Sequence, residues 1–269
     1  MKILFVLLII GIVALIWSIF EAQVFGITKI RLTNKKYNGK MKIVFISDIH
    51  YGKFYAPKRL EKIIESINYI NPDIILIGGD YFDIKRNSKL NKKYMHELIN
   101  QISKLNKRNR TFTVIGNHDY YICEDKEQFF NSIIANDIVV LKNNSVEVEV
   151  NGQSIAIHGL DDLFEGQVDV DKLQLNPELM NIVISHNPDV YQQFNKGFDI
   201  GFAGHNHGGQ ITLFGLYAPV TESEYGQKFI KQVNNLGNTV IITTKGLGTS
   251  SMPLRFFAYP EIMEIDINQ

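Results

Sequence analysis

Five short runs of apolar, largely β-branched residues each lead into a segment that contains Asp, Asn or His. In chain order these segments read "MKIVFISDIH", "DIILIGGD", "TFTVIGNHD", "MNIVISHNPD" and "FDIGFAGHNH". An apolar run that ends in polar and turn-forming residues is typical of a buried strand that leads into a loop. Open α/β sheets build their sites in the loops at the strand ends, so we expect these polar side chains to gather in one place.

The rest of the chain indicates how these strands are arranged. Apolar residues at helical spacing predict amphipathic helices between the early strands, and "SVEVEV" and "QSIAIHG" predict an antiparallel hairpin around Asn151-Gly152. Strands that alternate with helices and then dominate the sequence predict an α/β domain of stacked sheets flanked by helices. The predicted segments are the helices 57–70, 94–105 and 124–135, within a single domain at residues 41–269.

The N-terminal segment has a different composition from the rest of the chain. Ile3 to Phe20 is a run of 18 residues without a charge, and a membrane-spanning helix needs about 20 apolar residues, with a lower limit of about 17. We therefore expect a membrane anchor at residues 1–22 and a polar connector at residues 23–40. A cleaved signal peptide is the alternative, but its apolar core is usually about 7–15 residues long, and "SIFEAQVFG" offers no Ala-x-Ala cleavage site.

The basic residues that flank the anchor bear on its orientation. Lys2 precedes the apolar run, and six basic residues follow it: Lys29, Arg31, Lys35, Lys36, Lys40 and Lys42. An excess of Lys and Arg marks the cytoplasmic side, so we expect a single-pass cell-membrane protein with a cytoplasmic domain. Large domains can cross regardless of such charges, which leaves the external face as the alternative.

Charge argues against a nucleic-acid-binding protein, and the cysteine content excludes two kinds of structural cross-link. The chain has 28 basic and 28 acidic residues, so it has no global field that would favour nucleic acid as a partner. Its single cysteine, Cys123, excludes an intrachain disulfide and a Cys-rich zinc site.

The polar segments carry five of the seven histidines, together with acidic and amide side chains. Imidazole, carboxylate and amide oxygen ligands suit divalent first-row metals. Seven candidates are too many for one open four-coordinate site and suit two metals that share a bridging carboxylate. We expect His205 and His207, in a glycine-rich turn, to be divided between the two ions. The candidate ligands are Asp48, His50, Asp80, Asn117, His186, His205 and His207. Taken singly, each motif would more often be a turn with a satisfied side chain.

The motifs "SDIH", "GGDYFD", "GNHDYY", "SHNPD" and "GHNHGGQ", in this order, resemble the signature of the calcineurin-like metallophosphoesterases. The resemblance covers nearly all of residues 41–269, and "HGGQI" and "GLGTSSMPLR" are similar to the bacterial membrane-associated branch. It implies a four-layer α-β-β-α sandwich of mixed sheets with a dinuclear metal site at the strand ends. One departure is Asn206, where this branch commonly carries Thr.

The resemblance also implies how the ligands are divided. It places Asp80 between two ions as a bridge, with three further ligands for each ion. Manganese is the expected metal, with iron, zinc, cobalt or nickel as alternatives. The implied ligands of the first ion are Asp48, His50 and His207, and those of the second are Asn117, His186 and His205.

Three further residues receive roles through the resemblance and their chemistry. His118 resembles the family's outer-sphere histidine, which stabilises the transition state or protonates the leaving oxygen. Asp119 either orients that imidazole or caps a helix. Arg255 lies in a segment that the resemblance places near the site, where it either binds a substrate phosphate or forms a surface ion pair.

These features together predict a membrane-anchored phosphohydrolase that cleaves a phosphodiester or pyrophosphate bond by metal-activated hydroxide. The anchor and the apolar residues Met252, Leu254, Phe256 and Phe257 suggest a lipid-linked substrate. One alternative is a phosphomonoesterase or protein phosphatase with the same site. The other is a non-enzymatic membrane scaffold, which would have no need for seven polar groups that cost energy when buried and unpaired.

Overall fold

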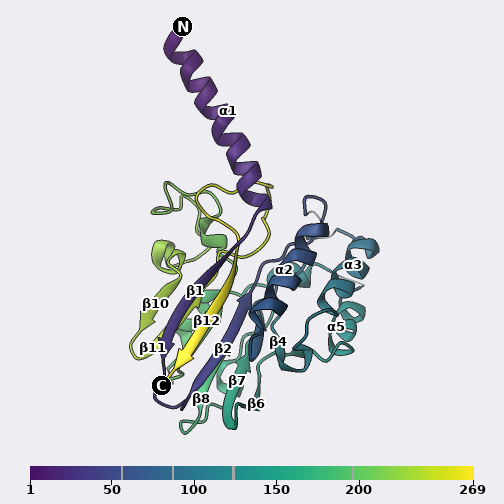
Figure 1. The fold of residues 1–269 in the computed structure, drawn as a ribbon, viewed down its shortest axis with the longest axis vertical. Coiled ribbons are helices and arrows are strands. Elements are labelled where there is room, and N and C mark those ends of the chain that lie inside the picture. The colour runs from purple at the N-terminus through teal and green to yellow at the C-terminus, as the bar shows by residue number, and fades with distance from the viewer. Residues whose placement is uncertain (56, 87, 123–124, 196) are drawn as a thin grey trace.

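Two six-stranded β-sheets stack face to face to form the body of the protein (Figure 1). The computed structural model describes residues 1–55, 57–86, 88–122, 125–195 and 197–269. The first sheet has the spatial order β1 (Gly26–Thr33), β12 (Glu261–Asn268), β2 (Lys40–Ile46), β3 (Ile74–Ile77), β4 (Thr111–Thr113) and β5 (Val139–Val140). The second sheet has the order β10 (Val233–Leu236), β11 (Thr239–Thr243), β9 (Ile200–Ala203), β8 (Met180–Ile184), β7 (Gln153–Gly159) and β6 (Asn144–Val150).

Both sheets are mixed, and each contains a block of parallel strands. In the first sheet β2, β3, β4 and β5 are parallel, and β12 pairs antiparallel with β2. In the second sheet β11, β9, β8 and β7 are parallel, while β10 and β6 pair antiparallel at the two edges. Parallel strands end at the same edge of a sheet, so the loops that follow them are brought together.

The central strands of the first sheet are apolar on both faces because each face packs against another layer of the protein. Ile43 and Phe45 of β2 point into the space between the sheets, where the Phe45 ring lies 5.2 Å from that of Phe202. Val44 and Ile46 point to the opposite face, toward the helices. Successive side chains of a strand alternate between faces, so a strand covered on both sides reads as a continuous apolar run.

Three helices cover the outer face of the first sheet: α2 (Pro57–Ile70), α3 (Lys92–Ile102) and α5 (Lys126–Ile134). Their apolar stripes face inward; that of α2 consists of Leu60, Ile63, Ile64 and Ile67. The three helices predicted from apolar spacing are confirmed, although α3 ends before Leu105. The third predicted helix begins at Glu124, which lies outside the described residues, as does Cys123.

The outer face of the second sheet is covered by loops and short helices. Val183 and Ile241 of the sheet pack there against Tyr191 and Phe229. This layer completes the predicted four-layer sandwich, with 3-10 helices in place of long α-helices. The short helices among the described residues are η1 (Arg108–Arg110), α4 (Asn117–Tyr120), η3 (Val170–Lys172), η4 (Pro188–Gln193), η5 (His207–Gly209) and η6 (Gly226–Ile230).

The N-terminal helix α1 (Lys2–Gln23) stands away from the sandwich (Figure 1). An 18-residue stretch of α1 has a mean hydropathy of 3.1, and only 6% of this stretch is buried in the protein. Among the described helices, α1 is therefore the one long and apolar enough to cross a membrane. Its last turn is different, because Ser18, Glu21 and Ala22 are buried against the domain. The segment 23–40, predicted as a connector, contains β1, which pairs in parallel with β12 from Gly26 to Thr33.

Candidate metal centre

The predicted ligands lie in the loops that follow the parallel strands of both sheets. Asp48 and His50 follow β2, Asp80 follows β3, and Asn117 begins α4 after β4. In the second sheet His186 follows β8, His205 follows β9, and His207 begins η5. Backbone contacts join the two edges, since the His205 N–H donates to both carboxylate oxygens of Asp48 at 3.0 and 3.1 Å. All seven side chains therefore come from one end of the sandwich.

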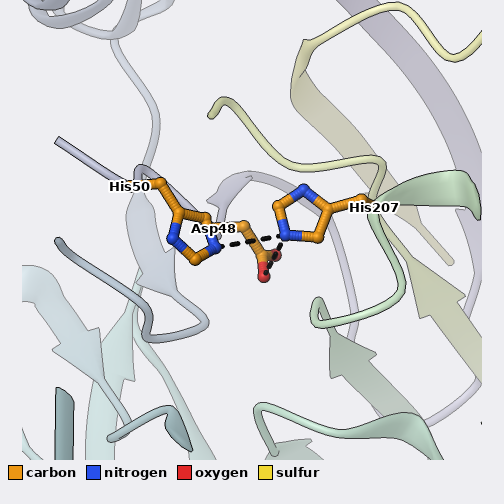
Figure 2. A group of neighbouring side chains, drawn as sticks. All are labelled: Asp48, His50 and His207. Carbon is orange, nitrogen blue, oxygen red and sulfur yellow. Dashed lines mark hydrogen bonds and ion pairs between the residues drawn. The ribbon is translucent and has the colours of Figure 1, made fainter. Parts of the chain in front are cut away.

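Asp48, His50 and His207 form one group (Figure 2). The Nε2 atoms of His50 and His207 are 3.1 Å apart, and Nε2 of His207 is 3.6 Å from Oδ1 of Asp48. All three side chains are buried. Their ligand atoms point toward a common centre, as a bound cation requires.

Asn117, His186 and His205 form a second group beside the first. Nε2 of His186 lies 3.1 Å from Oδ1 of Asn117 and 3.2 Å from Nδ1 of His205. The other ring nitrogen of His186, Nδ1, is 2.7 Å from the carbonyl oxygen of Gly78. That carbonyl fixes the orientation of the ring and leaves Nε2 to face the centre.

Asp80 lies between the two groups. Its Oδ2 atom is 3.5 Å from Nε2 of His50 and 3.2 Å from Nε2 of His186. Its Oδ1 atom accepts a hydrogen bond of 2.9 Å from the backbone N–H of His118. One carboxylate oxygen is thus within reach of both groups, which is the position of a bridging ligand.

The backbone at these positions is unusual for residues other than glycine. The φ angles are +52° at Asp48, +45° at His50, +55° at Asp80, +68° at His205 and +49° at His207. Backbone conformations of this kind cost about 1–3 kcal/mol each and cluster at functional sites. The sequence gives no signal for this strain, because its motifs specify residue types and not backbone angles.

Two glycines make room for the carboxylates. A Cβ atom on Gly116 would stand 2.2 Å from Oδ1 of Asp80, and one on Gly204 would stand 2.2 Å from Oδ2 of Asp48. Both distances are far below a van der Waals contact, so these positions have to be glycine for the carboxylates to sit where they do. The glycines of the motifs therefore serve close packing around the ligands as well as backbone freedom.

Burial keeps three of the histidines neutral. It lowers the pKa of His50 and of His205 to about 3 each, and it lowers the pKa of His207 well below the usual value. A neutral imidazole has the free lone pair that a metal ligand needs.

The carboxylates and His186 form a coupled buried cluster. Burial opposes charge on both Asp80 and His186, but their mutual attraction holds the pKa of Asp80 low and that of His186 high. Burial raises the pKa of Asp48 to about 6. Two buried carboxylates beside converging neutral imidazoles make a donor set that fits divalent first-row cations.

A cavity of ≈ 490 Å³ opens from this centre to the surface. Its polar end includes Asp80, Asn117, His118, His205 and His207, and its walls include Ile211, Val220 and Met252. Asn206, which stands between the predicted ligands His205 and His207, also lines the cavity. Its side chain is buried at the cavity, and both amide atoms have no hydrogen-bond partner within the described part of the chain.

His118 lies at the cavity without belonging to either ligand group. Its ring packs edge-on against that of His50, with centroids 4.7 Å apart. Nδ1 of His118 is 2.8 Å from the carbonyl oxygen of Ile84, which fixes the ring and makes Nδ1 the protonated nitrogen of the neutral form. Nε2 is then the nitrogen available for proton exchange.

Asp119 does not orient His118, contrary to one of the two roles expected from the sequence. Its Oδ2 atom accepts from the backbone N–H groups of Asp80 at 2.9 Å and Gly116 at 3.0 Å, and its Oδ1 atom accepts from Tyr81 at 2.9 Å. The other expected role, capping a helix, is confirmed in a different position: Asp119 is the third residue of α4, and its side chain caps the helix by accepting from the backbone N–H of Gly116, the N-cap residue. The buried carboxylate therefore positions the backbone of Asp80, while the Ile84 carbonyl orients His118.

Arg255 neither lines the cavity nor lies at the surface, so neither role expected from the sequence, a contact with a substrate phosphate or a surface ion pair, is found. The guanidinium is completely buried behind His207. It donates to the carbonyl oxygens of Gly248, Ala258 and His207, and its NH2 group is 3.2 Å from Nδ1 of His207. These acceptors occupy the donors that a phosphate would need, so Arg255 holds His207 in place.

The fold and the site define a class of protein, the metal-dependent phosphoester hydrolases. A family model described as calcineurin-like phosphoesterase matches residues 41–209, and the chain belongs to this family. The chain is 31% identical over 229 residues to the uncharacterised metallophosphoesterase YkuE of Bacillus subtilis, which covers 82% of this chain and 77% of that protein.

Two further relatives carry informative names. The phosphodiesterase YaeI of Escherichia coli is 29% identical to this chain over 233 residues, which are 84% of this chain and 82% of YaeI. A transmembrane protein with metallophosphoesterase domain from Danio rerio is 26% identical to this chain over 245 residues, which are 85% of this chain and 53% of the Danio rerio protein.

Proposed function

We propose that this protein is a membrane-anchored phosphohydrolase that cleaves a phosphodiester or pyrophosphate bond with two divalent ions. The observation that supports this best is the position of Asp80. Its Oδ2 atom lies 3.5 Å from Nε2 of His50 in one ligand group and 3.2 Å from Nε2 of His186 in the other. A carboxylate shared between two groups of nitrogen and oxygen ligands is the arrangement of a two-metal phosphoesterase site.

The proposed ligands follow the two groups. Asp80 joins both, and manganese is the metal we expect, which a donor set of oxygen and imidazole nitrogen without thiolate can hold. Iron, zinc, cobalt and nickel suit the same donors. The first ion would be held by Asp48, His50 and His207, and the second by Asn117, His186 and His205.

Bound divalent ions supply Lewis-acid activation of the attacking water and of the phosphoryl group. The chain's own residues do the rest. The cavity admits the phosphoester to the ligand groups, and Asp119 and Arg255 hold Asp80 and His207 in position. His118, fixed through Nδ1, acts in its doubly protonated form: it delivers the Nε2 proton to the oxygen of the leaving group and is left neutral with its proton on Nδ1.

A diester or pyrophosphate is favoured over a small monoester for two reasons. The Escherichia coli relative that covers 84% of the chain is named a phosphodiesterase. The cavity is also wider than a phosphate group needs, and its apolar walls suit a substituent on the far side of the phosphorus.

We further propose a lipid-linked substrate and a three-part chain. Residues 1–22 anchor the protein, residues 23–40 join the anchor directly to the first sheet by supplying β1, and residues 41–269 carry the ligands of the hydrolase. The apolar helix α1 and the transmembrane relative support the anchor. The basic residues that follow α1 support a cytoplasmic hydrolase, and protease accessibility in spheroplasts tests this orientation.

Two measurements test the proposed function. Metal analysis of the full-length protein purified from its own host should give about two divalent ions per chain. Hydrolysis of bis(p-nitrophenyl) phosphate should exceed that of p-nitrophenyl phosphate. The reverse preference would assign the site to a phosphomonoesterase or protein phosphatase. Metal-loaded protein that is inert on a broad phosphoester panel would indicate a scaffold.

A further inference from the structure

Large apolar side chains are exposed on two adjacent loops beside the cavity. We define the apolar rim as Leu213, Phe214, Leu216, Val220, Met252 and Phe257. Leu216 is 85% exposed and Phe214 75% exposed, and the other four range from 43% to 60%. A contiguous apolar surface of this kind normally marks an interaction site.

The rim is fastened to the last turn of α1. Glu21 is buried in that turn and accepts hydrogen bonds from the backbone N–H groups of Phe257 at 3.1 Å and Ala258 at 2.7 Å. The N–H of Arg255 donates to the carbonyl oxygen of Ser18 at 3.0 Å. The loop around Phe257 therefore keeps a fixed position relative to the helix.

The second loop of the rim is joined to the first. The N–H of Thr212 donates to the carbonyl oxygen of Phe256 at 2.9 Å, and the rings of Phe214 and Phe257 lie 5.4 Å apart. Both loops and the end of α1 thus form one connected surface.

There is no spacer between the apolar part of α1 and the domain. The run from Ile3 to Phe20 has 18 residues, which give about 27 Å of helix, close to the roughly 30 Å of a bilayer's hydrocarbon core. The next residue, Glu21, is already buried in the domain. Trp17 is half-exposed at this boundary, and its Nε1–H donates to Glu21 at 2.8 Å, a position typical of aromatic residues at a membrane interface.

We propose that the apolar rim is a second membrane contact, which seats the cavity mouth against the lipid bilayer. When α1 spans the membrane, the loops attached to its last turn lie at the headgroup boundary, where exposed Leu, Phe and Met side chains are stable. The bilayer is the occupant because the rim adjoins the point where α1 leaves the domain.

The cavity extends this inference to the substrate. Val220 and Met252 belong to the rim and also line the cavity that contains His118 and His207. An amphiphilic phosphoester could therefore reach the ligand groups while its apolar part stays in the membrane. This step rests on the proposed hydrolase activity, whereas the membrane contact rests only on the proposed anchor.

The test places a fluorophore at the rim of the full-length protein. Leu216→Cys is labelled with an environment-sensitive dye in a Cys123→Ser background and reconstituted in phosphatidylcholine vesicles. Some of the lipid carries a spin label near the headgroup end of the acyl chain. The matched control is Glu149→Cys, an exposed position on β6 near the hairpin at the opposite end of the sandwich (Figure 1).

We expect a blue-shifted emission and severalfold stronger quenching by the spin-labelled lipid at position 216 than at position 149. Equal quenching at the two positions would overturn the proposal. A blue shift without lipid quenching would also overturn it, because another protein surface, such as a second copy of the chain, would then cover the rim. None of these readings depends on hydrolysis, so their outcome is independent of the proposed hydrolase activity.

A second measurement addresses the substrate. The double variant Phe214→Ser, Leu216→Ser should hydrolyse soluble bis(p-nitrophenyl) phosphate at the unchanged rate, because neither side chain lines the cavity. Its rate on a vesicle-embedded phospholipid diester should fall severalfold. An equal rate of the two proteins on the vesicle substrate would overturn the role of the rim in substrate access.

Discussion

The metal centre and the apolar rim depart from the usual distribution of side chains in opposite ways. At the centre, polar groups such as Asp48 and His186 are completely buried. At the rim, Phe214 and Leu216 are largely exposed, although they follow His207 by only a few residues in the chain. Each region presents groups that the folded chain alone does not satisfy, which points to cations at one and a bilayer at the other.

The two regions also differ in how they are held. The ligands are fixed by strained backbone, by close-packed glycines and by buried hydrogen bonds such as those of Asp119 and Arg255. Phe214 and Phe257 of the rim also have positive φ angles, of +55° and +53°, but no rim side chain makes a buried hydrogen bond among the described contacts. The loop around Phe257 is held to α1 by the hydrogen bonds of Phe257 and Ala258 to Glu21. Substitutions at the centre should therefore have large effects under all conditions, and those at the rim should act when a membrane is present.

The largest effect is expected for Asp80→Asn. An amide cannot replace the carboxylate oxygen that both ligand groups share, so metal and activity should be lost together. Because metal-ion stabilisation amounts to several kcal/mol, the rate should fall by about 10³-fold or more. Metal content and turnover measure this, with circular dichroism to show that the fold remains. A variant that kept both ions and full turnover would remove Asp80 from its bridging position.

His118→Ala comes next. Both ions should be retained, because His118 belongs to neither ligand group, while kcat should fall by roughly 10²–10⁴-fold through loss of the proton donor. His96→Ala is the matched control, since His96 is exposed on α3. Turnover equal to that of the control would exclude His118 from the reaction.

A smaller effect is expected for Asp119→Asn. The amide would place an N–H group against at least one of the three backbone N–H groups that the carboxylate now accepts from. We expect the free energy of unfolding to fall by about 1–3 kcal/mol, and metal affinity to weaken by about 10–100-fold through displacement of Asp80. Urea unfolding and metal titration measure the two effects.

Asp125→Asn is the control for this prediction. Asp125 forms a surface ion pair with Lys92 at 3.6 Å, so its loss should change stability by less than about 1 kcal/mol. If Asp119→Asn bound metal as tightly as this control, Asp119 would support the fold without positioning Asp80.

The smallest effect is expected for Leu216→Ser measured in detergent. The side chain is 85% exposed, so the free energy of unfolding should change by no more than about 0.5 kcal/mol, and hydrolysis of a soluble ester should not change. A loss of more than about 1 kcal/mol would show that the side chain packs within the protein, which would remove the contrast between rim and centre.

Sequence alone determined which side chains gather at the site. Strands buried on both faces read as apolar runs, so the polar residues that interrupt them stand out, and parallel strands must end at one edge. The runs that end at Asp48, Asp80 and His205 followed this rule. The apolar N-terminal run likewise predicted a helix like α1 from length and hydropathy.

Only the tertiary structure decided what the neighbouring side chains do. Arg255 has the chemistry for phosphate binding, but it donates to the carbonyls of Gly248 and Ala258 and lies against the ring of His207. Asp119 has the chemistry for orienting a histidine, but it accepts from the N–H groups of Asp80 and Tyr81. The sequence also could not predict that the rim is exposed, because an apolar residue in a loop can either pack into the core or face the solvent. Burial and hydrogen-bond partners depend on segments distant in the chain, and local sequence does not record them.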